Sequence, residues 1–129
     1  MITWSDGRLK SFITSALRGA FRRYPNKYEV LKEALVGKRL NNKTNRVSAH
    51  YKCAECNEDF PTKEVQVDHV LPIVDPSEGF ISWDAFIANL FCSKDNLQVL
   101  CKPCHKIKTL KENKKRKENV NSKKISKTG

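Results

Sequence analysis

Cysteines are the residues of this sequence whose spacing points most directly to chemistry. Cys53 and Cys56 form one Cys-x-x-Cys pair, and Cys101 and Cys104 form a second. Four thiolates in two such pairs are the ligands of a tetrahedral structural zinc site. We therefore expect one zinc ion on these four residues. The remaining cysteine, Cys92, has no such partner and is expected to be a small apolar residue in the interior.

The two pairs enclose a long stretch, residues 57–100, whereas a plain zinc ribbon has roughly 15 to 20 residues there. We call residues 57–100 the zinc loop, and we expect this loop to contain further structural elements. The run from Cys101 to His105 also fits the Cys-x-x-Cys-His pattern of haem attachment. That chemistry requires export and a second axial ligand, but the sequence has no secretion signal and its only methionine is Met1. The odd number of cysteines also argues against a disulfide framework.

A second group of residues that could do chemistry lies inside the zinc loop. Asp68 and His69 are consecutive at the end of an expected strand, so their side chains point to opposite faces. One of them can hold a metal while the other faces a substrate. His105 directly follows Cys104, and one helical step turns its ring away from the zinc side, so it could bind a second metal together with Asp68. Taken alone, an Asp-His pair is usually a hydrogen-bonded structural pair.

These motifs occur in a fixed order from Tyr51 to Thr109: Cys53-x-x-Cys56, then Val67-Asp68-His69-Val70-x-Pro72, then Asn96-Leu97-Gln98-Val99-Leu100-Cys101-x-x-Cys104-His105-x-x-Lys108. This order resembles the HNH endonuclease family, and the overall layout is most similar to small phage-encoded HNH proteins. The resemblance implies an α+β fold with a ββα-metal core, stapled by the four-cysteine zinc site. An N-terminal helical region would precede this core, and a basic tail would follow it. The stretch between His69 and Asn96 is longer than in the simplest family pattern.

The resemblance also implies a role for each motif residue. His69 would be the general base, and Asp68 and His105 would hold one catalytic Mg²⁺ or Mn²⁺ ion. Asn96 would fix the loop that carries the base, although an ordinary turn asparagine is the alternative. Phosphodiester hydrolysis of this kind leaves a 5′ phosphate and a 3′ hydroxyl.

Charge predicts the partner. The 129 residues carry a formal charge of +11 at pH 7. Residues 1–50 have 11 basic against 3 acidic side chains and residues 106–129 have 10 against 2, whereas residues 51–105 have 4 against 9. A polyanion is the natural ligand of the flanks, and we expect DNA, in duplex form, rather than a membrane. The expected DNA contacts are Arg18, Arg22, Arg23, Lys108, Lys114, Lys115, Arg116 and Lys117.

Hydrophobic periodicity predicts the elements that position these residues. A helix is expected up to Phe21 after a Ser5 or Asp6 cap, and a second from Pro25 to Leu35, ended by Gly37. Residues 38–50 read as a loop, with His50 on the surface. Strands are expected at 65–70 and 97–100, with a helix at 83–91 after a Ser82 cap. A last helix would begin near Pro103, and the chain beyond about Asn113 would be disordered.

The sequence thus predicts a basic N-terminal helical region (1–50), an HNH nuclease core (51–112) and a basic tail (113–129). No apolar run is long enough for a membrane span, so we expect a cytoplasmic protein that is not secreted, inside a bacterial host if it is phage-encoded. The leading hypothesis is a metal-dependent DNA endonuclease that nicks as a monomer. The alternatives are a non-catalytic zinc-stapled module that binds nucleic acid or protein, and a nuclease for RNA or branched DNA. The oligomeric state stays open.

Overall fold

Two helices begin the chain in a computed structural model that describes residues 3–128, with side chains described through residue 118. α1 (Asp6–Phe21) is capped by Ser5, whose hydroxyl accepts a hydrogen bond from the Arg8 amide at 3.2 Å. α2 (Pro25–Ala34) opens on proline, whose fixed φ and missing N–H suit the first helical turn. Both helices were predicted.

A β-hairpin follows, where the sequence had predicted a helix end and a loop. β1 (Leu35–Asn41) pairs antiparallel with β2 (Arg46–Lys52), and Gly37 forms part of a bulge in β1 instead of ending α2. Asn41 closes the turn, because its side-chain oxygen accepts from the Lys43 amide at 3.0 Å and its carbonyl from Asn45 at 2.8 Å. The expected loop at 38–50 is therefore wrong, and within the predicted helical region only residues 6–21 and 25–34 are helical.

β3 (Asp59–Pro61) joins the hairpin in an antiparallel sheet of order β1-β2-β3. Within it His50 is buried, with 6% of its surface exposed, and its Nδ1 lies 2.9 Å from the Ser48 carbonyl oxygen. The expectation of a surface His50 is therefore corrected. A short 3₁₀ turn, Thr62–Glu64, then leads out of this sheet.

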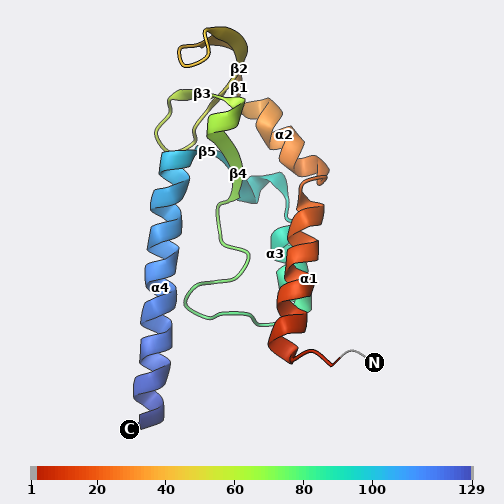
Figure 1. The fold of residues 1–129 in the computed structure, drawn as a ribbon, viewed down its shortest axis with the longest axis vertical. Coiled ribbons are helices and arrows are strands. Elements are labelled where there is room, and N and C mark those ends of the chain that lie inside the picture. The colour runs from red at the N-terminus through yellow and green to blue at the C-terminus, as the bar shows by residue number, and fades with distance from the viewer. Residues whose placement is uncertain (1–2, 129) are drawn as a thin grey trace.

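The remaining elements form the second half of the molecule (Figure 1). β4 (Val65–His69) pairs antiparallel with β5 (Leu97–Cys101), and α4 (Lys102–Thr128) begins directly after β5. Between the strands lie α3 (Trp83–Leu90), capped by Ser82, and a 3₁₀ turn, Lys94–Asn96. β4, β5 and the first turns of α4 thus make the expected ββα unit, and the fold class is α+β.

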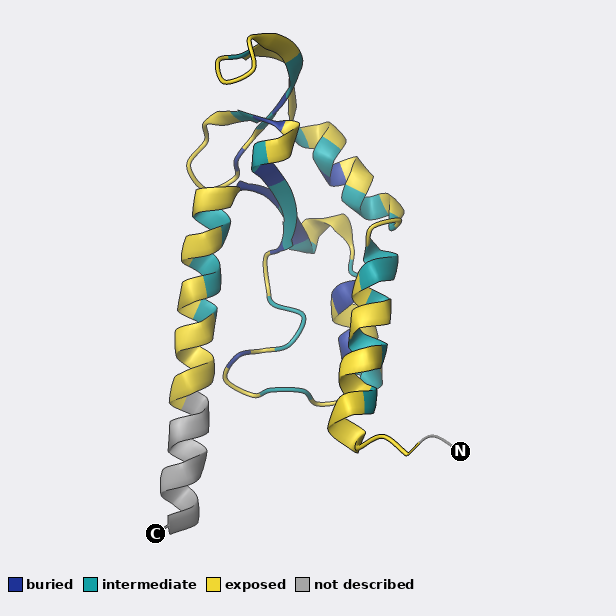
Figure 2. Ribbon diagram, in the orientation of Figure 1, coloured by how far each residue is buried: buried dark blue, intermediate teal, exposed yellow. Residues whose placement is uncertain are grey.

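The main core joins the N-terminal helices to this unit. Val30 of α2 packs in one cluster with Val65, Leu97 and Val99, and the ring of Phe21 closes one side of it. These positions are dark blue or teal in Figure 2. Burial of one such valine contributes about 1.5 kcal/mol or more, so α2 is bound to the β4-β5 sheet and is not a separate unit.

α4 is longer than the sequence predicted. Disorder was expected from about residue 113, but the helix runs on to Thr128 (Figure 1). Its Lys-rich sequence consists mainly of good helix formers, and nucleation is already achieved by the packed first turns, so extension costs little. Among the described residues, no helix is long and apolar enough to cross a membrane.

Candidate active site and metal centre

The four paired cysteines converge although they come from two distant segments. Cys53 and Cys56 follow the end of β2, whereas Cys101 ends β5 and Cys104 lies in the first turn of α4. Their Sγ atoms all lie within 4.8 Å of one another, and Cys56 Sγ is 4.0 Å from Cys101 Sγ. Four sulfurs on a zinc ion at about 2.3 Å would be about 3.8 Å apart, so this cluster can hold zinc after only a small contraction.

The thiols of this cluster have divergent acidities. Burial raises the pKa of Cys53, but hydrogen bonds from the backbone of Cys101, Cys56 and Glu55 outweigh it and lower that pKa to about 6. A hydrogen bond with Cys101, together with burial, raises the pKa of Cys104 to about 12. Cys53 is therefore a thiolate at neutral pH, whereas Cys104 needs a bound cation to lose its proton.

Beside the sulfur cluster, Asp68 and His105 face each other. Asp68 is near the end of β4, opposite Gln98 of β5, and His105 follows Cys104 on α4. The Nε2 atom of His105 lies 3.5 Å from Asp68 Oδ1. Two neighbouring ligands of a Mg²⁺-sized ion are about 3 Å apart, since each lies about 2.1 Å from it at a right angle. This carboxylate and imidazole pair therefore fits one divalent ion.

Lys108 occupies the other side of the Asp68 carboxylate. Its Nζ lies 2.8 Å from Asp68 Oδ2 and 2.9 Å from Glu112 Oε1, and it donates to the His69 carbonyl oxygen at 2.7 Å. Burial lowers the pKa of Lys108, but the hydrogen bonds to Asp68 and Glu112 prevail and raise it above its usual value. The expected phosphate ligand is thus bound to the carboxylates of the site.

His69 is held on the opposite face of β4. Only 9% of its surface is exposed, and its ring lies 4.9 Å from the Phe21 ring, centre to centre. Its Nε2 is 2.8 Å from the carbonyl oxygen of Leu90, at the end of α3. A carbonyl only accepts, so Nε2 must carry the hydrogen, and in the neutral ring Nδ1 keeps the lone pair. Within the described residues, Nδ1 has no hydrogen-bond partner.

Asn96 ties the loop after His69 to β5. Its side-chain oxygen accepts from the Leu71 amide at 2.9 Å, its Nδ2 donates to the Leu71 carbonyl at 3.4 Å, and its own carbonyl accepts from the Val70 amide at 2.8 Å. The Asn96 side chain therefore bonds to both the backbone N–H and the backbone carbonyl of one residue, Leu71, two positions beyond His69. These bonds connect the loop after His69 to the 3₁₀ turn before β5.

The segment between His69 and α3, which we call the insertion, lines a hollow of about 830 Å³ between α3 and α4. Leu71, Ile73 and Phe80 form part of its wall on one side, and Lys111 and Lys115 on the other. Asn89 of α3 anchors the insertion by donating to the Ile73 carbonyl at 3.1 Å. The insertion thus packs against the face of the molecule next to the site.

The residues expected to contact DNA lie on different elements of the structure. Arg22 and Arg23 are exposed just after α1, next to Phe21, whose ring contacts His69, while the Arg18 guanidinium lies 5.7 Å from the centre of the Phe86 ring. Four further residues of the expected set are exposed on α4: Lys114, Lys115, Arg116 and Lys117. Sequence reasoning missed the Leu90 carbonyl, because a backbone acceptor has no residue type to reveal it.

Comparison with known proteins yields a family match. The family model of HNH endonucleases matches residues 53–111, the stretch that holds both cysteine pairs, Asp68, His69, Asn96 and His105. No curated protein and no solved structure matches the chain. The matched stretch coincides with the segment that forms the sulfur cluster and the ββα unit. This chain contains an HNH endonuclease domain.

Proposed function

We propose that this protein is a metal-dependent DNA endonuclease that hydrolyses phosphodiester bonds. One observation carries the proposal: Asp68 Oδ1 and His105 Nε2 lie 3.5 Å apart, and the next residue along β4 is a histidine whose ring is fixed by a backbone carbonyl. A cation site beside an oriented base is the arrangement that phosphodiester hydrolysis requires. Membership of the matched domain in a nuclease family supports the same conclusion.

In this proposal, His69 is the general base. Its Nε2–H stays bonded to Leu90, so Nδ1 takes the proton of an incoming water. The water oxygen attacks phosphorus, the bond from phosphorus to the 3′ oxygen breaks, and the 3′ oxygen picks up a proton from solvent. The products are a 5′ phosphate and a 3′ hydroxyl. The Leu90 carbonyl can accept from the charged ring as well as from the neutral one, so the ring need not move.

Asp68 and His105 would hold Mg²⁺ or Mn²⁺, since a carboxylate and an imidazole suit these ions and leave other positions to water and phosphate. When bound, the ion neutralises charge on the phosphate and on the leaving oxygen. Asp68 and His105 keep their side chains at this point through β4 and the first turn of α4. The four cysteines would hold one structural zinc ion that braces the same turn of α4.

A non-catalytic binding module on the same scaffold is the competing function. It would need the zinc cluster and the basic flanks, but no oriented base. RNA or branched DNA as substrate is a variation of the leading proposal, because the same residues act on any phosphodiester. Initial rates on duplex, single-stranded and junction substrates separate these possibilities.

The decisive experiment follows supercoiled plasmid as it converts to open circles and linear DNA. Purified protein is incubated with Mg²⁺ or Mn²⁺ beside a His69→Ala variant prepared in the same way, which controls for contaminating nucleases. We expect open circles first, since one active site cuts one strand, and at least a roughly hundredfold loss of rate in the variant. Zinc content and DNA binding should be unchanged in the variant.

Two results would count against the proposal. Cutting by His69→Ala at the wild-type rate would remove the base assignment. Tight DNA binding by the wild-type protein with no cutting of any nucleic acid substrate would favour the binding module.

A further inference from the structure

The β1-β2 hairpin projects from the molecule, away from the β4-β5 sheet. Figure 1 shows its turn at the end opposite the C-terminus of α4, and Figure 2 shows the tip as exposed. The side chains of Leu40 and Val47, which face each other across the two strands, are 55% and 65% exposed. The hairpin lies before residue 53, outside the stretch that matches the HNH family model. The family match therefore does not account for the hairpin.

All the Asp, Glu, Lys and Arg positions of the hairpin are occupied by the basic residues. Residues 34–54 contain no aspartate or glutamate, but they include Lys38, Arg39, Lys43, Arg46 and Lys52. Such a run is not needed for the fold of a two-stranded ribbon, since strand pairing uses backbone groups. A concentration of one charge sign on an exposed element indicates a ligand of opposite charge.

Two ion pairs fix the hairpin against the body of the protein. Arg39 Nε lies 3.2 Å from Asp59 Oδ2 of β3, and Lys43 forms an ion pair with Glu64 in the 3₁₀ turn. Arg46 has no carboxylate partner within the described residues. The hairpin is thus held in one place while part of its positive charge stays available.

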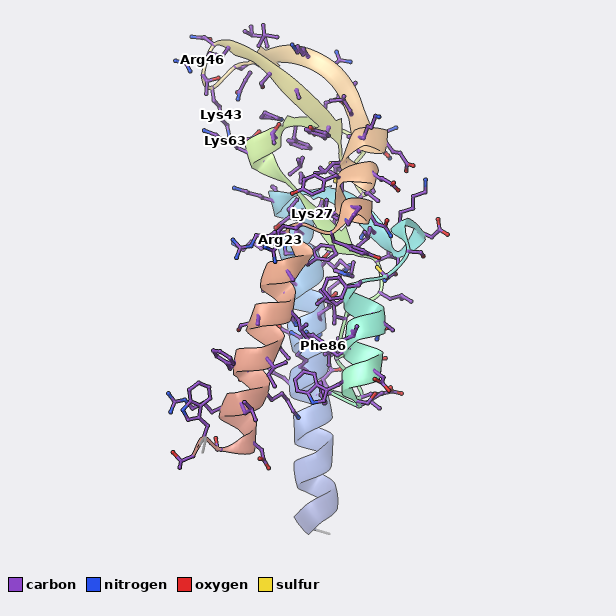
Figure 3. All side chains as sticks on the ribbon, turned by 90° about the vertical axis from the view of Figure 1, so that its right-hand side faces the viewer. Arg23, Lys27, Lys43, Arg46, Lys63 and Phe86 are labelled. Carbon is purple, nitrogen blue, oxygen red and sulfur yellow. The ribbon has the colours of Figure 1, made fainter. Side chains whose placement is uncertain are left out.

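The charge continues from the hairpin toward the base. Figure 3 shows Lys43, Arg46, Lys63, Lys27 and Arg23 along one side of the molecule, from the hairpin turn down to the junction of α1 and α2. We name these five residues the basic strip. Within the described residues, only Lys43 among them has an acidic partner.

The lower end of the basic strip adjoins the candidate site. Arg23 is two residues from Phe21, whose ring packs 4.9 Å from the ring of His69. DNA lying on the strip would therefore pass the base with its phosphates already bound on one flank. Each seven-residue strand of the hairpin spans roughly 23 Å, which corresponds to about seven base pairs of duplex.

We propose that the basic strip is a DNA-binding surface on which the β1-β2 hairpin follows one flank of the duplex next to the bond that is cut. This inference rests on the proposed function. Phosphate contacts come from the strip, and the exposed Leu40 and Val47 on the ribbon contact the sugar and base edges of a groove. A two-stranded ribbon has the width that the major groove admits. Acidic proteins and RNA are the other polyanions that the test must distinguish.

The test removes four charges from the strip and four from elsewhere. The strip variant carries Arg23→Gln, Lys27→Gln, Arg46→Gln and Lys63→Gln. The control variant carries Lys10→Gln, Lys32→Gln, Lys102→Gln and Lys106→Gln, so both have the same net charge. Fluorescence anisotropy with a labelled duplex of about 30 base pairs, roughly 100 Å long, is measured over a salt series without added divalent ion.

We expect the strip variant to bind the duplex at least about tenfold more weakly near 0.1 M salt. Its salt slope should fall by about 3 to 4, since each lost phosphate contact contributes about 0.9. The control variant should stay within about twofold of wild type, because exposed charges away from the DNA are screened. Equal losses in both variants would overturn the proposal, since net charge alone would then explain binding. A strip variant that loses affinity for RNA or an acidic protein but not for duplex DNA would also overturn it.

Failure of the proposed function gives a different result. If the wild-type protein binds duplex through the strip but cuts no nucleic acid, the endonuclease proposal fails while the strip assignment stands. If the strip variant cuts at the wild-type rate both below and above saturation, the strip assignment fails while the nuclease stands. A lower rate only below saturation supports both.

Discussion

Lys108 shows how one side chain can take the place of a bound ion. Its ammonium group lies within hydrogen-bond distance of Asp68, Glu112 and the His69 carbonyl. Its raised pKa keeps it protonated, and the stability that this contributes is fully present below the ordinary lysine pKa and is lost only as pH rises through the raised value. Lys108 thus neutralises the carboxylate that would hold the catalytic ion.

A cation already bound to Asp68 should compete with a second one. We predict that Lys108→Met binds Mn²⁺ several-fold more tightly than wild type, because removal of a positive charge 2.8 Å from Asp68 Oδ2 relieves repulsion of the incoming ion. Calorimetry of Mn²⁺ binding measures this without any cleavage. Lys111→Met, an exposed lysine on the same helix, is the matched control. Unchanged or weaker Mn²⁺ binding in Lys108→Met would contradict the prediction.

Phe21 is the second residue that acts through a contact with the candidate site, here with His69. Its ring packs against His69 from a helix outside the HNH match. We predict that Phe21→Ala lowers the rate of plasmid cleavage at saturating protein about tenfold, since the base can then rotate away from its aligned position. Zinc content and Mn²⁺ affinity should not change. Phe12→Ala, on the same helix with 60% of the residue exposed, should cut normally, and equal losses in both variants would refute the role of Phe21.

At the scale of elements, the Asn96 turn holds the end of β4 in register. We predict that Asn96→Ala lowers the free energy of unfolding by about 1 to 2 kcal/mol and speeds hydrogen exchange at the Leu71 amide, which loses its acceptor. Asn89→Ala removes a comparable bond to Ile73 further along the same loop and is the control. Its exchange effect should be absent at Leu71, and a similar rate there in both variants would contradict the prediction.

The elements that were predicted from the sequence share a local signal. α3 has its apolar spacing and its Ser82 cap, and the alternation of β4 marks a half-buried strand. The spacing of Cys53, Cys56, Cys101 and Cys104 fixed the sulfur cluster because ligand geometry constrains sequence directly.

The β1-β2 hairpin could not be predicted in the same way. Its outer strand faces solvent on both sides near the tip, so the period-two pattern is reduced to the single Leu40 and Val47 pair. His50 was misplaced for the same reason, since its burial depends on pairing with Pro61 of β3. The contacts of Lys108 and Phe21 likewise arise from tertiary packing between elements far apart in the chain.

At the scale of the whole molecule, the sulfur cluster connects the two halves of the fold. It links the end of β2, which belongs to the hairpin sheet, to the start of α4, which carries His105 and Lys108. The same cluster therefore joins the element that we propose binds DNA to the element that presents the candidate metal ligand. Its integrity should affect both.

Loss of the metal should consequently disrupt more than the loop around it. We predict that Cys104→Ser lowers zinc below one ion per chain and lowers Tm by about 10 °C or more, because binding free energy at a structural zinc site is also folding free energy. Cys92→Ser, a cysteine outside the cluster, is the matched control and should keep both. Elemental analysis and thermal unfolding provide the two readouts. If Cys104→Ser kept the wild-type Tm, β2 and α4 would be held together by the apolar contacts of Cys53 and Leu100 alone, and the cluster would not be the structural link between the two halves.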